Sequence, residues 1–115
     1  MLVKDLSRVE KKPLDMEGAQ GVMKQVPLSR DDGAPTFSFR VFTIEPGGHT
    51  PLHRHQCEHM NYVIAGQGLL VAKDREHAIE KGNFAMVLPD EIHQFKNTSA
   101  SEPLVIICAV PKECE

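Results

Sequence analysis

Short apolar or alternating runs, separated by turn-forming residues, account for most of the chain. Clusters rich in Gly, Pro, Asn and Asp, such as Pro46-Gly47-Gly48, lie between the runs, and no strong amphipathic helix pattern is present. Short runs at intervals of about 8 to 12 residues predict an all-β sandwich or barrel. The predicted strands are Val22 to Leu28, Thr36 to Ile44, Tyr62 to Ala65, Leu69 to Lys73, Phe84 to Leu88, His93 to Lys96 and Leu104 to Val110.

Two of these runs are unusually apolar. Thr36 to Ile44 is dense in Phe and β-branched residues, which predicts a buried strand leading into the turn at Pro46. Leu104 to Val110 is apolar at every position, so we expect both of its faces to be covered. One face would meet the barrel interior and the other a second subunit, which makes a homodimer the expected assembly.

Composition limits the classes of partner. With 115 residues, 41% of them apolar, the chain has enough material for one core, so a single domain over residues 1 to 115 is predicted. The 13 basic and 16 acidic residues are interspersed, with a net charge of −3, so the sequence has no cluster of basic residues that could bind nucleic acid. A small-molecule substrate is therefore expected, and nucleic acid is not.

The N-terminal segment and the cysteines bear on location. Residues 1 to 15 are charged throughout and lack the apolar run of a signal peptide, and the longest apolar run is too short to span a bilayer. Cys57, Cys108 and Cys114 are odd in number and unrelated in spacing, which predicts reduced thiols. We therefore expect a cytoplasmic protein without membrane contact.

Four histidines form a candidate metal site. Neutral imidazole binds divalent first-row metals, and residues i and i+2 of an extended chain share a face, so His53 and His55 project together. His59 has the same parity, whereas Glu58 would point away. His93, which follows the turn Pro89-Asp90-Glu91, is the candidate from the second half of the chain.

The spacing of these residues resembles the paired motifs of the cupin superfamily. The two segments are Gly47-x5-His53-x-His55-x3-His59-x6-Gly66 and Gly82-x10-His93-x3-Asn97. His59 stands where most cupins have glutamate, Pro89 lies one residue late, and Glu91 is taken to replace a glycine. The resemblance implies a cupin-type double-stranded β-helix, a jelly-roll-like barrel, with its conserved core at residues 36 to 111 and an N-terminal arm at residues 1 to 35.

The histidine at position 59 narrows this resemblance. With this histidine the chain is similar to small single-domain cupins that have a four-histidine site. That resemblance implies one divalent transition metal, with manganese as the first candidate and iron, nickel, copper or zinc as alternatives. Four neutral ligands leave the ion its full double charge, and an octahedral ion would keep two positions for substrate, water or dioxygen. Glu58 as the ligand in place of His59, or an added Cys57 thiolate, are the competing arrangements.

Three function classes remain open. We favour a metal-dependent oxidoreductase of the dioxygenase type acting on a small organic substrate. The alternatives are a non-redox isomerase or lyase, for which His49, Tyr62 or Glu91 would have to serve as the base, and a non-catalytic module that binds a small ligand or senses metal.

Other residues receive structural interpretations. His49 is expected in a solvated turn, His77 at the surface, and Tyr62 as a strand aromatic at the rim. For residues 1 to 35 three roles are open: an added strand, a segment that crosses to a dimer partner, or an irregular arm. The predicted apolar lining of the barrel consists of Met60, Phe84, Met86, Phe95 and Ile106.

Overall fold

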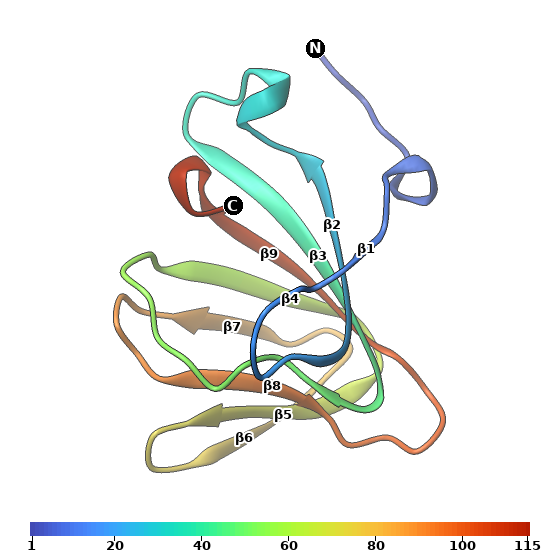
Figure 1. Cartoon of the computed structure of the whole chain (residues 1–115), viewed down its shortest axis with the longest axis vertical. Helices are drawn as coiled ribbons and strands as arrows, with labels where there is room; N and C mark the ends of the chain where they lie inside the picture. The colour runs from blue at the N-terminus through green and yellow to red at the C-terminus, as the bar shows by residue number, and fades with distance from the viewer.

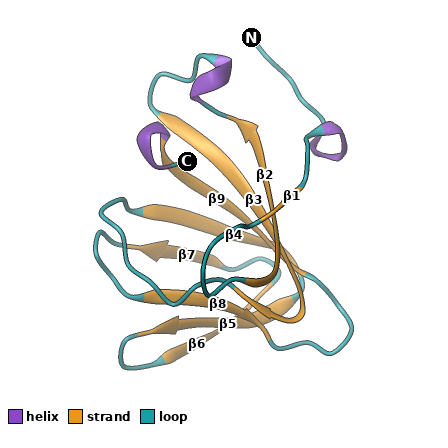
Figure 2. Ribbon diagram, in the orientation of Figure 1, coloured by secondary structure: helices purple, strands orange, loops and turns teal.

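Nine antiparallel strands form a single curled sheet in the computed structural model, which describes all 115 residues (Figures 1 and 2). The all-β prediction is confirmed, because the helical content is limited to three short turns, Leu6–Arg8, Arg30–Asp32 and Lys112–Cys114. No helix is therefore long enough to cross a membrane. The strands are β1 (Lys12–Pro13), β2 (Gln20–Leu28), β3 (Phe37–His49), β4 (His59–Ala65), β5 (Gln67–Ala72), β6 (Glu76–Glu80), β7 (Phe84–Val87), β8 (His93–Asn97) and β9 (Leu104–Pro111).

The long strand β3 joins the two halves of the sheet. The strand order is β6-β5-β8-β3-β9-β4-β7, with β2 paired to β3 and β1 paired to β2. Residues 37 to 44 of β3 pair with β9, whereas His49 at its end pairs with Lys96 of β8. The sheet therefore curls around an interior in which Ile44, Leu104 and Ile106 are almost completely buried.

All seven predicted runs fall on strands, and two strands were not predicted. The strand β6 is an edge strand in which only Ile79 is buried, so its sequence shows little apolar alternation. The strand β1 has two residues, both exposed, and is held by its pairing with Lys24 and Met23 of β2. Neither strand carries a pattern that distinguishes it from a polar loop.

Side-chain direction corrects several expectations about the core. On β9 the even-numbered residues are buried and the odd-numbered ones half-exposed, so one face is covered within the chain, and coverage of the other by a second subunit stays a prediction. The predicted lining is correct for Phe95 and Ile106 and wrong for Met60, Phe84 and Met86, whose side chains are exposed. On β4 the buried His59 and Asn61 flank Met60, so the pleat sends Met60 outward, opposite Met86 of β7.

The strand β3 shows the same alternation. Phe37 and Phe39, expected to be buried, are 66% and 43% exposed, while Ser38 between them is 1% exposed. Together with Met60, Phe84 and Met86 they lie on the outward side of β3, β4 and β7, with β9 between β3 and β4, and we call these five residues the outer apolar face.

Within residues 1 to 35, Lys12–Pro13 and Gln20–Leu28 add the strands β1 and β2 to the sheet, as in the first of the three roles considered. The strand β2 runs antiparallel to β3, with Lys24 opposite Phe42. The buried side chain of Gln25 donates hydrogen bonds to the carbonyl oxygens of Leu6 and Val9, at 2.9 and 3.0 Å. This amide therefore attaches the first residues of the chain to the sheet.

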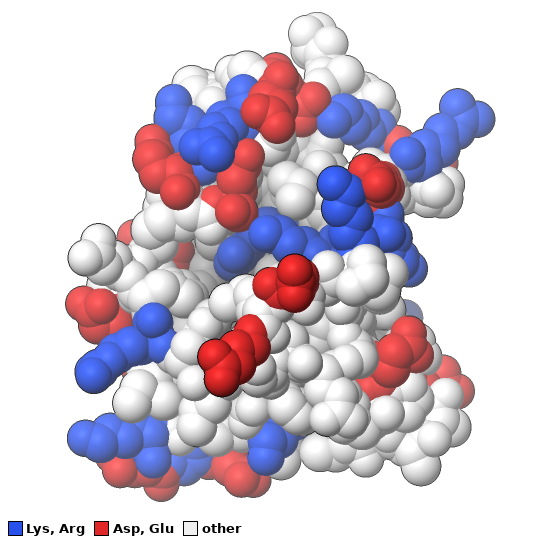
Figure 3. Space-filling model, viewed as in Figure 1, with Lys and Arg blue, Asp and Glu red and all other residues white.

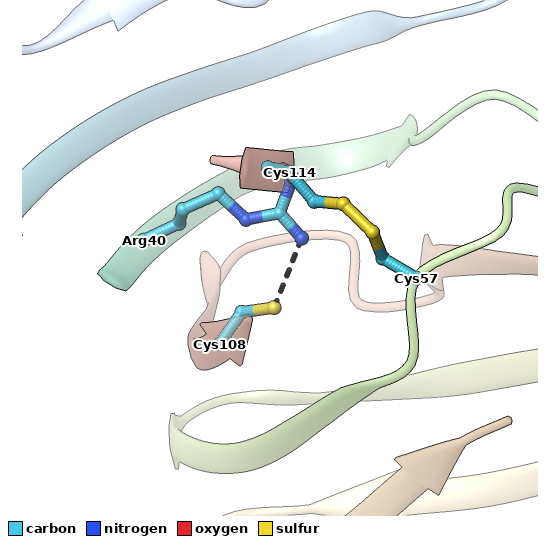
Figure 4. Close-up of a disulfide and its surroundings, with 4 residues drawn as sticks. All are labelled: Arg40, Cys57, Cys108 and Cys114. Atoms are coloured by element: carbon cyan, nitrogen blue, oxygen red, sulfur yellow. Dashed lines mark hydrogen bonds between the residues drawn. A yellow bond between two sulfur atoms is a disulfide. The ribbon is translucent and has the colours of Figure 1, made fainter. Parts of the chain in front are cut away.

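Two of the three cysteines are joined. Cys57 and Cys114 form a disulfide with a Cα to Cα distance of 6.4 Å, and Cys108 is free and buried (Figure 4). The prediction of three reduced thiols is therefore wrong for Cys57 and Cys114, because the C-terminal turn returns to the segment between β3 and β4. Spacing along the chain could not reveal a pair 57 residues apart.

Candidate metal centre

Backbone hydrogen bonds bring the two histidine segments together. His53 and His93 form an antiparallel bridge, with the His53 amide donating to the His93 carbonyl at 3.1 Å and the reverse bond at 2.9 Å. On either side, the Thr50 amide donates to the Phe95 carbonyl at 2.9 Å and the Asp90 amide to the His55 carbonyl at 2.8 Å. The loop after β3 is thus fastened to the start of β8, which places residues 40 positions apart on one wall.

The four imidazole rings converge. Ring nitrogens of His53, His55 and His93 all lie within 4.8 Å of one another, a cluster that could hold a metal ion. His59, the first residue of β4, places its Nε2 3.1 Å from Nε2 of His93. Five of the six ring pairs have centroids 4.9 to 5.2 Å apart, and the pair His53 and His59 is the exception.

Hydrogen bonds at the other ring nitrogen orient two of these ligands. The Nδ1 of His93 lies 2.8 Å from the carbonyl oxygen of Glu91, which can only accept, so Nδ1 carries the proton and Nε2 keeps its lone pair. The Nδ1 of His59 lies 3.1 Å from Oδ1 and 2.9 Å from Nδ2 of Asn61, and this Nδ2 also donates to the Ala85 carbonyl at 3.3 Å. In the tautomer in which Nδ1 of His59 donates to Oδ1 of Asn61, the Nε2 lone pairs of His59 and His93 face each other, an arrangement that fits a cation between them.

Burial keeps three of the imidazoles neutral. Desolvation, followed by the nearby His93, His55 and Arg40, lowers the pKa of His53 to about 4. Desolvation also lowers the pKa of His59 to about 3, against the opposing effect of its hydrogen bond to Asn61. The pKa of His93 is lowered by burial too. Neutral imidazole is the form that ligates metals, so at pH 7 these residues need not lose a proton first.

The motif residues around the histidines have structural roles. Gly66 has a φ of 85°, and a Cβ there would collide with the Pro103 carbonyl oxygen. The buried side chain of Asn97 donates to the carbonyls of Ile44 and Glu102, at 2.9 and 2.8 Å, and accepts from the Ser99 amide at 2.9 Å. Asn97 therefore ties the end of β8 to β3 and to the following loop.

The turn before His93 corrects one expectation. Glu91 was taken to replace the motif glycine, but Asp90 is the residue with positive φ, at 64°. Asp tolerates this left-handed conformation better than most side chains do, so it can occupy a glycine position. Glu91 instead accepts a hydrogen bond from the Leu88 amide at 2.8 Å through its side chain, which closes the turn.

The competing ligand candidates are not available as the sequence analysis considered them. Glu58 is exposed and does not line the cavity, and Cys57 lines it, but its sulfur is engaged in the disulfide. His77 is exposed on β6, as expected. His49 is half-buried, with Nδ1 3.2 Å from the Thr50 carbonyl, and does not line the cavity. Tyr62 packs against Phe84 at a centroid distance of 4.5 Å, also outside the cavity.

The histidines open into a cavity of about 470 Å³. Its apolar wall includes Phe42, Phe95 and Val110, and its polar wall includes three residues that the sequence analysis did not single out: Lys24, Arg40 and Asn61. Acidic and basic side chains are mixed over the face of the molecule that Figure 3 shows.

Comparisons with known proteins agree with this fold. The model of the family described as "Cupin domain" matches residues 40–110. Auxin-binding protein T85 of Nicotiana tabacum is 39% identical over 62 residues, covering 54% of this chain and 30% of that protein. The 1-methylthio-D-xylulose 5-phosphate methylsulfurylase of Rhodospirillum rubrum is 33% identical over 86 residues, covering 68% of this chain and 49% of that protein.

Structural similarity extends over the whole chain. The polyketide cyclase RemF of Streptomyces resistomycificus superimposes with a TM-score of 0.91 at 26% identity, covering 100% of this chain and 80% of that one. The chain spans between 30% and 63% of the length of the auxin-binding relatives that it matches.

Proposed function

This chain belongs to the cupin domain family, and from that premise we propose that it is a metal-dependent oxidoreductase of the dioxygenase type acting on a small organic substrate. One divalent transition metal, with manganese the first candidate, would be held by His53, His55, His59 and His93. The observation that carries the proposal is the convergence of four imidazoles, three of them with lowered pKa, on one wall of a cavity.

The ring contacts support a common ion for these residues. His55 and His93 each lie within 5.2 Å, between ring centroids, of the other three histidines. The four imidazoles would hold the ion, and any position that they leave open would be available to a substrate or a second reactant.

The cavity wall offers few groups for acid-base chemistry. Glu115 provides its one carboxylate side chain, and it is held by Ser38 and by Arg30. Isomerases and lyases of this kind need a base near the substrate, and Lys24 is the remaining candidate on the wall. The metal would supply the oxidising or Lewis-acid chemistry, and four neutral ligands would leave its double positive charge undiminished.

The residues of the chain would orient the substrate and exclude water. Asn61 and the Glu91 carbonyl fix the rings of His59 and His93 through Nδ1, so that Nε2 of each faces the proposed ion. Phe42, Phe95 and Val110 form an apolar wall against which an organic substrate would lie.

One observation favours a non-redox alternative. The polyketide cyclase that superimposes over the full length of the chain is named for a cyclisation, and carbonyl polarisation by the same ion would suit such a reaction. Oxygen uptake distinguishes the two classes. Aerobic and anaerobic turnover would be compared with diketones, phenols and thiols as candidate substrates. The oxidoreductase proposal requires that turnover stop without oxygen, and equal turnover in both conditions would contradict it.

Metal content tests the site itself. Purified protein should contain about one equivalent of a first-row ion per chain, and the double variant His53→Ala, His55→Ala should contain none. Glu58→Gln is the matched control in the same loop and should keep the metal, because Glu58 is exposed and outside the cavity.

We also propose a homodimer. The outer apolar face includes Phe84, 81% exposed, and Met60 and Met86, which lie side by side on β4 and β7. Large contiguous apolar faces on a soluble chain are typical of interfaces, and a second copy would cover this one.

A further inference from the structure

Two cationic side chains share the cavity with the histidines. Arg40 and Phe42 have the same parity on β3, and Lys24 of β2 lies directly opposite Phe42 in the antiparallel register. On the other side of β3, Cys108 of β9 lies opposite Arg40. Lys24, Arg40, Phe42 and Cys108 therefore project from one sheet face, and all four line the cavity.

Arg40 has no carboxylate partner. Its Nη2 donates to the Cys108 sulfur at 3.1 Å (Figure 4), and its Nη1 donates to the Cys114 carbonyl at 3.4 Å. Burial raises the pKa of the Cys108 thiol, so this neighbour is a neutral, weak acceptor and not a counter-ion. The buried Nε of Arg40 has no partner at all. Three of the five guanidinium N–H groups are thus without a protein acceptor.

Lys24 is similarly without a partner. Its ammonium group takes part in none of the three ion pairs of the chain, which are Lys4 with Asp32, Lys12 with Glu10, and Arg30 with Glu115. Burial and the nearby charge of Arg40 lower the pKa of Lys24, against weaker opposing effects of Glu115 and Cys108. Glu115, the one carboxylate side chain of the same wall, is engaged by Ser38 and Arg30, so Lys24 and Arg40 have no anion of their own, and a bound anion would offset the cost of holding two like charges there.

We propose that Lys24 and Arg40 form an anion-binding subsite, and that the substrate of this cavity is a small organic carboxylate. The carboxylate would bind between the guanidinium fork and the ammonium group, since the planar fork matches two carboxylate oxygens. The apolar body of the substrate would lie along Phe42, over which the guanidinium carbon already sits at 5.1 Å from the ring centre, and would extend toward the histidines. This inference rests on one part of the proposed function, namely that the substrate binds in this cavity.

Benzoate is a suitable probe, and benzamide is its neutral counterpart of the same shape. Binding would be measured by isothermal titration calorimetry with metal-free protein, so that a metal cannot contribute to affinity. We expect benzoate to bind at least tenfold more tightly than benzamide, and Arg40→Met to remove this preference. Arg75→Met, which deletes the same charge from the exposed turn between β5 and β6, is the matched control and should keep the preference.

Two further measurements keep the test decisive. If Arg40→Met does not fold, two other measurements replace it. One is the binding of benzoate and benzamide to Lys24→Met, and the other is the Nε–H resonance of Arg40 in the wild-type protein. Benzoate should shift that resonance, and benzamide should not. Equal binding of benzoate and benzamide to the wild-type protein, or a preference that survives Arg40→Met, would overturn the subsite. A chain that binds benzoate as expected but takes up no metal would contradict the proposed function and leave the subsite intact.

Discussion

Reducing the disulfide between Cys57 and Cys114 should destabilise the protein substantially. The bond closes a loop with a sequence separation of 57 residues, and the loop-closure relation gives a loss of about 4 kcal/mol in the free energy of unfolding when such a link is removed. Because Cys57 lies between His55 and His59, the reduced chain should also hold the candidate metal loop less firmly. The variant Cys114→Ser should reproduce the effect without reductant.

Urea unfolding followed by circular dichroism measures this loss. With an m-value of about 1.5 kcal/mol/M, the midpoint should fall by about 2.7 M on adding reductant to the wild-type protein. Cys114→Ser is the internal control, because its midpoint should already be low and should not respond to reductant. Thiol titration of the unfolded, unreduced wild-type protein should find Cys108 alone. Three titratable thiols, or a midpoint that reductant leaves unchanged, would refute the reasoning.

Three further predictions concern Asn97, acid stability and the outer apolar face. Asn97→Ala should lower the unfolding free energy by about 3 kcal/mol in urea titrations, because buried carbonyls lose their donor; an effect no larger than that of the exposed Asn83→Ala would contradict this. The folded pKa values of His53 and His59 lie below their unfolded value of 6.5, so the unfolded chain binds more protons, and metal-free protein should lose stability as the pH falls from about 6.5 toward 4. Equal urea midpoints at pH 7.5 and 5 would count against the neutral-imidazole description. Met60→Glu should halve the mass measured by light scattering, whereas Leu52→Glu, exposed but outside that face, should not; a monomeric wild-type protein would exclude the dimer.

The strands and the histidine positions could be predicted because each depends on local pattern. Alternation and turn residues locate seven strands, and His53 and His55 share a face in any extended segment. The convergence of His93 on them depends on the bridge between distant segments, which the sequence suggests only through its resemblance to a family motif.

The errors arise where side-chain parity was not applied. Once His59 is taken to point inward, Met60 must point outward, and the exposed methionines follow from the sequence alone. The same rule places Arg40 on the inward face with Ile44, so a charged residue inside the cavity could have been anticipated from its position in an apolar run. The partner of Cys57 could not, because the return of the C-terminal turn depends on the whole fold.

Extended X-ray absorption fine structure of the metal-loaded protein tests the central claim most directly, because it counts imidazole ligands around the ion. The account predicts four in the wild-type protein and three in His59→Gln, with Glu58→Gln unchanged at four. A wild-type spectrum that fits three imidazoles, or one that His59→Gln does not alter, would contradict it.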